Sequence, residues 1–121
     1  MLFTTYKRPH MSKLIPVFKE GRITAYIFDC PGCGDSHEVA IYPNKNTQGA
    51  SWLFNGNAKK PTFSPSINVQ ITRTKSGLPD KICHGWVTDG QITFMADSTH
   101  HLRGQKVELP DQEVSTNAVH G

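Results

Sequence analysis

The residues best suited to chemistry are three cysteines and the histidines near them. Cys30 and Cys33 lie in a Cys-Pro-Gly-Cys-Gly turn, and the third cysteine, Cys83, is followed directly by a histidine. Two thiolates in a Cys-x-x-Cys turn can hold one metal ion, and zinc prefers Cys and His ligands in tetrahedral geometry. The spacing therefore predicts a Zn²⁺ site built from Cys30, Cys33 and Cys83.

Three cysteines leave one position of a tetrahedral site to be filled. His37 is the first choice because it lies only four residues after Cys33, near enough to fold back over the turn. His100 and His84 are the alternatives, and a water molecule in this position would make the site catalytic instead of structural. A thioredoxin-like dithiol is excluded because the pattern of alternating strands and helices around such a motif is missing.

A catalytic site would also need acid–base groups. Glu38 could serve, and His84 with Asp97 could form an oriented acid–base pair, although a hydrogen bond that ties a hairpin is the simpler explanation of that pair. Ser64 and Ser66 lack the Gly-x-Ser-x-Gly elbow of a nucleophilic serine, so we expect them to serve a turn.

Short strands must position these residues. Ile23–Phe28 is rich in β-branched and aromatic residues and leads into the cysteine turn, while His37–Tyr42 leads out of it. This order predicts a hairpin like a zinc-ribbon arm, with two thiolates in its loop. Ile67–Thr72 alternates apolar and polar residues and is the clearest half-buried strand.

A second hairpin is predicted around Asp89-Gly90, a dipeptide favoured in two-residue turns. Counting outward through the strands 81–88 and 91–98 gives the cross-strand pairs Val87–Ile92, Gly85–Phe94 and Cys83–Ala96 on one face, and Trp86–Thr93 and His84–Met95 on the other. The split into two faces supports this register, because a slip of one residue would mix them. Neighbours on a strand point to opposite faces, so we expect Cys83 or His84, but not both, to bind the metal.

Composition favours one compact domain. The chain has 121 residues, of which 36% are hydrophobic, with 10 Gly and 8 Pro. We expect a mostly β fold, a small β-sandwich or rolled antiparallel sheet with a zinc-knuckle hairpin. The predicted domain covers residues 14–110, between a flexible extension at 1–13 and a flexible tail at 111–121.

The cysteine count and the net charge limit the environment and the partners. Three cysteines do not suit a disulfide scaffold, and the sequence has neither a signal peptide nor the ~18 apolar residues of a membrane span, so we expect a protein of a reducing cytoplasm. The net charge of +3 is dispersed, and only Lys59, Lys60, Arg73 and Lys75 could make a weak nucleic-acid contact.

Several motifs, in their order along the chain, resemble those of one family. They are Cys30–Gly34 with His37, Trp52–Asn57, Lys60–Ile67, Cys83-His84, Asp89–Ile92 and Asp97–His100. Together they cover roughly residues 14 to 110 and resemble small phage and prophage proteins of unassigned function, sometimes mislabelled as ammonia monooxygenases. The resemblance implies a phage-borne protein in the host bacterial cytoplasm or on the virion, with a zinc site. Relatives often carry a cysteine where this chain has Ser98, which implies a four-thiolate site that is weakened here.

From these observations we expect a non-enzymatic phage accessory protein, whose zinc-stabilised β domain binds a host or phage protein. A zinc-dependent hydrolase, with cysteine ligands and the His84–Asp97 pair, is the alternative. A weak nucleic-acid binder is a third hypothesis.

Overall fold

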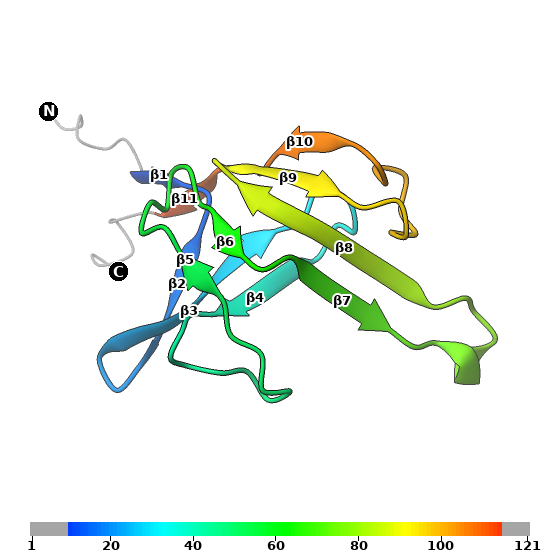
Figure 1. Cartoon of the computed structure of the whole chain (residues 1–121), viewed down its shortest axis with the longest axis horizontal. Helices are drawn as coiled ribbons and strands as arrows, with labels where there is room; N and C mark the ends of the chain where they lie inside the picture. Colours follow the sequence, from blue (N-terminus) through cyan, green and yellow to red (C-terminus); the bar gives the residue numbers. More distant parts are fainter. Residues whose placement is uncertain (1–9, 115–121) are drawn as a thin grey trace, which may run out of the picture.

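The computed structural model describes residues 10–114, and strands dominate them (Figure 1). The predicted mostly β fold is confirmed. The elements are β1 (His10–Ser12), β2 (Ile15–Lys19), β3 (Arg22–Asp29), β4 (Ser36–Ala40), β5 (Leu53–Phe54), β6 (Phe63–Ser64), β7 (Ile67–Ile71), the 3₁₀ helix η2 (Thr74–Ser76), β8 (Lys81–Thr88), β9 (Gln91–Phe94), β10 (Lys106–Glu108) and β11 (Gln112–Val114). No helix among these residues is long and apolar enough to cross a membrane.

Two antiparallel sheets enclose the core. One has the strand order β2-β3-β4, and the other has the order β10-β9-β8-β7. Phe28 and Val39 of the first sheet pack in one buried cluster with Val87, Ile92 and Phe94 of the second, and each of these side chains is at most 1% exposed. Full burial of such a side chain stabilises the fold by about 1.5–3 kcal/mol. This packing makes the protein a small sandwich with a thin core.

The predicted hairpin between β8 and β9 forms with the expected register. Val87 pairs with Ile92 and Gly85 with Phe94. Asp89 and Gly90 have φ angles of 51° and 79°, as a two-residue turn between twisted strands requires.

The predicted pairing of Cys83 with Ala96 is wrong. The β9 strand ends at Phe94, although the Met95 N–H still donates to the His84 carbonyl at 2.7 Å. The chain then turns, with a 3.1 Å hydrogen bond from the Ser98 N–H to the Met95 carbonyl. This turn brings residues 97 and 98 back over His84 instead of along Cys83.

Two strands lie outside the predicted domain limits of 14 and 110. β1 pairs antiparallel with β11, so residues 10–12 and 112–114 form a strand pair. The remaining parts of the predicted extension and tail, residues 1–9 and 115–121, lie outside the described residues. The two ends of the domain therefore support each other.

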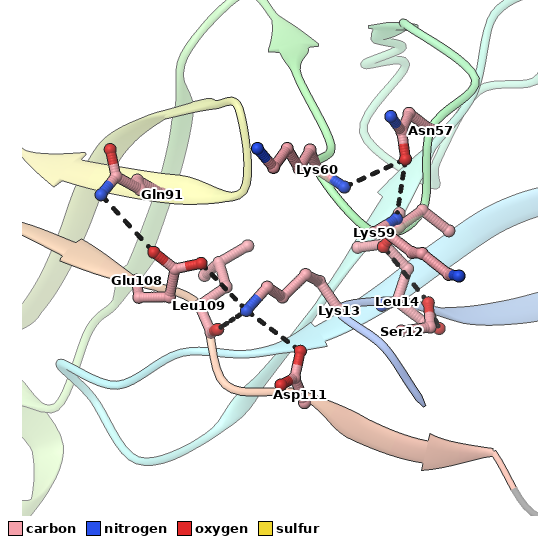
Figure 2. A network of polar contacts seen from close by, with 11 residues as sticks. Ser12, Lys13, Leu14, Asn57, Lys59, Lys60, Gln91, Glu108, Leu109 and Asp111 are labelled. Atoms are coloured by element: carbon pink, nitrogen blue, oxygen red, sulfur yellow. Dashed lines mark hydrogen bonds and ion pairs between the residues drawn. The ribbon is translucent and has the colours of Figure 1, made fainter. Parts of the chain in front are cut away.

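Lys13 fastens this strand pair to the core (Figure 2). Its Nζ donates to the Leu109 carbonyl at 2.8 Å and lies 3.1 Å from a Glu108 carboxylate oxygen and 3.0 Å from one of Asp111. Burial lowers the pKa of Lys13, but the hydrogen bonds to Asp111 and Glu108 outweigh it and leave the pKa raised. The ammonium group is thus held charged beneath the C-terminal segment.

Candidate functional site

The cysteine turn lies between β3 and β4, as predicted. The Cys30 N–H donates to the Asp35 carbonyl at 2.8 Å, and the Gly34 N–H donates back to the Cys30 carbonyl at 3.0 Å. Gly32 has no substitute here, because a Cβ at this position would lie 2.3 Å from the ring of His100. The turn is therefore closed by its own backbone and covered by that ring.

Four potential metal ligands meet beside this turn. The ligand atoms of Cys30, Cys33, His37 and Cys83 all lie within 4.8 Å of one another. The Sγ atoms of Cys30 and Cys83 are 3.5 Å apart, and the Sγ of Cys33 is 3.1 Å from Nε2 of His37. Tetrahedral zinc with bonds of about 2.0–2.3 Å separates its ligand atoms by roughly 3.5–3.8 Å. The donor set suits one tetrahedral ion with four protein ligands, and the Cys30–Cys83 separation matches that geometry, whereas the Cys33–His37 separation is shorter.

The electrostatics of the cluster favour a thiolate. The hydrogen bond from Cys83 lowers the pKa of Cys30 to about 3, against the opposing effect of burial and with further help from His37. The same contact and burial raise the pKa of Cys83. A thiolate is the form that binds a metal, so Cys30 is prepared for one.

The other two histidines considered as fourth ligands have different partners. His100 packs edge-on against Phe94, with ring centroids 4.3 Å apart, and its Nδ1 accepts the Leu102 N–H at 3.2 Å. Burial lowers the pKa of His100, which keeps the ring neutral. His84 lies on the opposite face of β8 from Cys83, as strand alternation requires.

A second constellation occupies that opposite face. The Oγ of Ser66 lies 3.1 Å from Nε2 of His84, and Nδ1 of His84 lies 3.1 Å from each carboxylate oxygen of Asp97. Ser66 directly precedes β7, His84 is in β8, and Asp97 is in the turn after β9. A serine, a histidine and an aspartate linked in this order form the arrangement that activates a serine nucleophile.

The pairing of β7 with β8 positions the serine. Ile67 pairs with Gly85 and Asn68 with His84, so the same register places Ser66 opposite Trp86 and diagonal to His84. The interpretation of Ser66 as a turn residue rested on the missing elbow motif. That criterion does not apply to this fold, because here a strand edge presents the serine.

Backbone contacts fix both ends of the serine–histidine pair. The buried Ser98 hydroxyl accepts the His84 N–H at 3.0 Å and donates to the His84 carbonyl at 3.1 Å. The indole N–H of Trp52 donates to the Ser66 carbonyl at 3.2 Å. Ser98 therefore holds the histidine and, being committed to it, is not a member of the metal cluster.

The remaining predicted residues lie elsewhere. Glu38 is exposed on the face of β4 opposite His37, away from both constellations. Lys59 and Lys60 follow Ala58, whose carbonyl is bound by the Lys13 N–H beside β1. Arg73 and Lys75 lie at the far tip of the β7–β8 hairpin (Figure 1). The four basic residues are thus divided between two distant places.

Comparison with known protein families matches residues 4–95 to "Bacterial ubiquitination-like system serine protease (BubE)". The match includes Ser66 and His84 and ends two residues before Asp97. No curated protein and no solved structure matches the chain. The prediction of a phage accessory protein that acts only by binding is wrong, since the matching family is one of serine proteases from a bacterial system. Because the match spans most of the 121 residues, the chain belongs to the BubE family of serine proteases of bacterial ubiquitination-like systems.

Proposed function

We propose that this protein is a serine protease in which Ser66 is the nucleophile, His84 the general base and Asp97 the group that orients and charges the histidine. The observation that carries the proposal is the continuous chain of contacts from Ser66 Oγ through both ring nitrogens of His84 to the Asp97 carboxylate, at 3.1 Å each. The family description supports it independently.

The geometry assigns each residue one step. Nε2 of His84 accepts the proton of Ser66 as Oγ attacks the carbonyl carbon of the substrate, which gives a tetrahedral intermediate. The protonated ring then gives that proton to the departing amine, and an acyl group remains on Ser66. Water, activated by the same histidine, releases the acyl group as a carboxylic acid. Asp97 accepts the Nδ1–H throughout and stabilises the positive ring.

The backbone N–H of Ser66 is suited to the developing oxyanion. β7 is an edge strand of its sheet, and within residues 10–114 the Ser66 N–H makes no backbone hydrogen bond. In a serine protease the nucleophile's own N–H is a common oxyanion donor, and each such donor contributes about 10²–10³ to the rate. Trp52 binds the Ser66 carbonyl, which holds the Ser66–Ile67 peptide beside this N–H.

The metal in this proposal is Zn²⁺ with a structural role. Four protein ligands leave no open position for a reacting water, and Cys30, Cys83 and His37 are 2%, 6% and 7% exposed. The ion would link the β3–β4 hairpin to β8 and so join the two sheets of a thin core.

The substrate class follows from the family. We propose that the substrate is an amide bond in a protein of a bacterial ubiquitination-like system, so that the protein partner is the substrate itself. The triad lies at the surface, with Asp97 55% and His84 22% exposed, which leaves room for a segment of a folded partner.

The test is covalent labelling of the full chain by a fluorophosphonate, which reacts only with an activated serine. The expected result is one phosphonyl group bonded to Ser66 Oγ, with loss of fluoride, located by peptide mass mapping. Ser66→Ala should abolish the adduct, and His84→Gln should slow its formation by at least 10²-fold.

Matched controls are Ser76→Ala and His101→Gln, which change the same residue types at exposed positions outside the triad. Both should label at the wild-type rate. An adduct that persists in Ser66→Ala, or no adduct at all on the zinc-loaded wild-type protein, would overturn the proposal.

A further inference from the structure

A shallow apolar groove lies directly beside the nucleophile. Its cavity volume is about 360 Å³. It is lined by Tyr42, Ser51, Trp52, Leu53, Ser64, Pro65 and Trp86, among which there is no charged side chain. Tyr42, Leu53 and Trp86 are 65%, 62% and 43% exposed, so the groove gathers three large exposed apolar side chains in one place. These residues come from separate parts of the chain and present their apolar surface to solvent together.

The groove is continuous with the proposed catalytic centre. Ser64 and Pro65 form part of its wall and lead directly into Ser66. Trp86 lies two residues from His84 on β8, so both side chains are on the same face, and the register places Trp86 opposite Ser66. Trp52 lines the groove and also binds the Ser66 carbonyl through its indole N–H. A side chain in this groove therefore belongs to a residue close to the bond that Ser66 attacks.

We infer that this groove is the specificity subsite of the enzyme and that it binds one large apolar side chain of the substrate, such as leucine or phenylalanine, adjacent to the cleaved bond. This inference rests on the proposed serine protease function. An aliphatic or aromatic side chain would remove the exposed faces of Leu53 and Trp86 from water. A carboxylate would lose its hydration in a groove that offers it no cation.

The expected discrimination is considerable. Transfer of a leucine-sized side chain from water into an apolar site typically corresponds to a factor of about 10–100 in binding. We therefore expect kcat/KM for acyl esters and short peptides to be at least tenfold higher with leucine than with aspartate beside the cleaved bond.

Binding to the groove can be measured without catalysis. The chain has two tryptophans, Trp52 and Trp86, and both line the groove, so tryptophan emission reports directly on its occupation. In the Ser66→Ala protein, N-acetyl-leucinamide should change the emission in a saturable manner. N-acetyl-aspartamide with a free side-chain carboxylate should bind at least tenfold more weakly.

A charged substitution tests whether the groove causes the preference for leucine. Leu53→Asp should reduce leucinamide binding and the leucine preference in kcat/KM at least tenfold. The matched control is Leu78→Asp, since Leu78 is 51% exposed and lies in the connection between β7 and β8, outside the groove. Fluorophosphonate labelling of Ser66 should be unchanged by Leu78→Asp.

The outcomes separate the two proposals. A reactive Ser66 without a leucine preference, or with a preference that Leu53→Asp leaves intact, overturns the subsite alone. An unreactive Ser66 overturns the protease function, and the subsite role with it, even if leucinamide binds. Reactivity together with a preference that Leu53→Asp removes, and Leu78→Asp does not, supports both.

Discussion

Asp97→Asn should lower kcat/KM by roughly 30- to 150-fold without unfolding the protein. The substitution keeps the shape of the side chain and removes the charge that stabilises the His84 ring when it is protonated. The carboxylate oxygens lie 3.1 Å from Nδ1. At that separation the charge interaction is about 1.3 kcal/mol in water and about 5 kcal/mol near a protein surface with an effective dielectric constant of 20.

The exposure of the pair decides where in that range the effect lies. Asp97 is 55% exposed and His84 is 22% exposed, so water screens the pair from one side. An intermediate value of about 2–3 kcal/mol corresponds to the stated loss, since 1.36 kcal/mol is tenfold in rate. Asparagine can also donate to Nδ1, which would leave the proton of the neutral ring on Nε2. Nε2 could then not accept the hydroxyl proton of Ser66.

The assay is the rate of fluorophosphonate labelling together with kcat/KM on a leucine ester. Asp80→Asn is the control, because Asp80 is an exposed aspartate that accepts the Arg73 N–H at 3.1 Å, away from the triad. Urea denaturation of both variants checks the fold. A loss below threefold for Asp97→Asn, or an equal loss in both variants, would refute the role given to Asp97.

Three further predictions concern the metal cluster, the support of His84 and the fold around Lys13. Removal of the metal with a chelator should lower both the melting temperature and the labelling rate, because the metal would hold Cys83, the neighbour of His84 on β8. Melting curves and metal analysis measure this. Ser98→Ala should reduce the free energy of unfolding by about 1–3 kcal/mol and slow labelling, since it leaves the His84 N–H without its acceptor. Urea denaturation measures the free energy of unfolding, with Ser76→Ala as the control. Finally, the pKa of Lys13 is raised in the folded state, so its charged form stabilises the fold. This stabilisation is complete below pH 10.5 and is lost as the pH rises through the pKa of Lys13 in the folded state. Lys13→Met should abolish this alkaline loss, and exposed Lys19→Met should retain it in pH-dependent denaturation curves.

Each of these has a contrary result. A metal-free protein that melts and labels as before would remove the structural role of the metal. Equal stability of the Ser98→Ala and Ser76→Ala proteins would remove the role of Ser98. An alkaline loss of stability that persists in Lys13→Met would assign it to another group.

The metal cluster was largely predictable because local chemistry defines it. The spacing of Cys30 and Cys33, and the closeness of His37, depend on one tight turn. Cys83 could be added because it is the third and last cysteine of the chain, while a two-residue turn fixes the register of β8 and β9 by counting. That counting failed only past Phe94, where the turn at residues 95–98 replaces the ladder.

The serine of the proposed triad was missed for a physical reason. His84 and Asp97 lie in one hairpin and could be paired by counting, but Ser66 reaches them only through the pairing of β7 with β8. The connection between those strands spans residues 72–80, and a loop of that length does not determine which residues face each other. The chain order of serine, histidine and aspartate also differs from the orders in the well-known hydrolase motifs. Only the structure supplies the register.

The alternation of side chains along β8 explains how so small a domain could hold the proposed triad rigidly. Cys83 points inward to the metal cluster, and His84, the next residue, points outward to Ser66 and Asp97. A catalytic constellation must be held within about 0.5 Å, and strands whose own positions are locked achieve this better than loops. Here β7 is an edge strand, and the core beneath it is thin. A metal that holds Cys83 would therefore also hold the backbone of His84. The Ser98 hydroxyl already forms hydrogen bonds with the N–H and the carbonyl of His84. In the proposed mechanism such a metal would take no part in the bond-breaking steps, yet it would support the precision of the proposed triad.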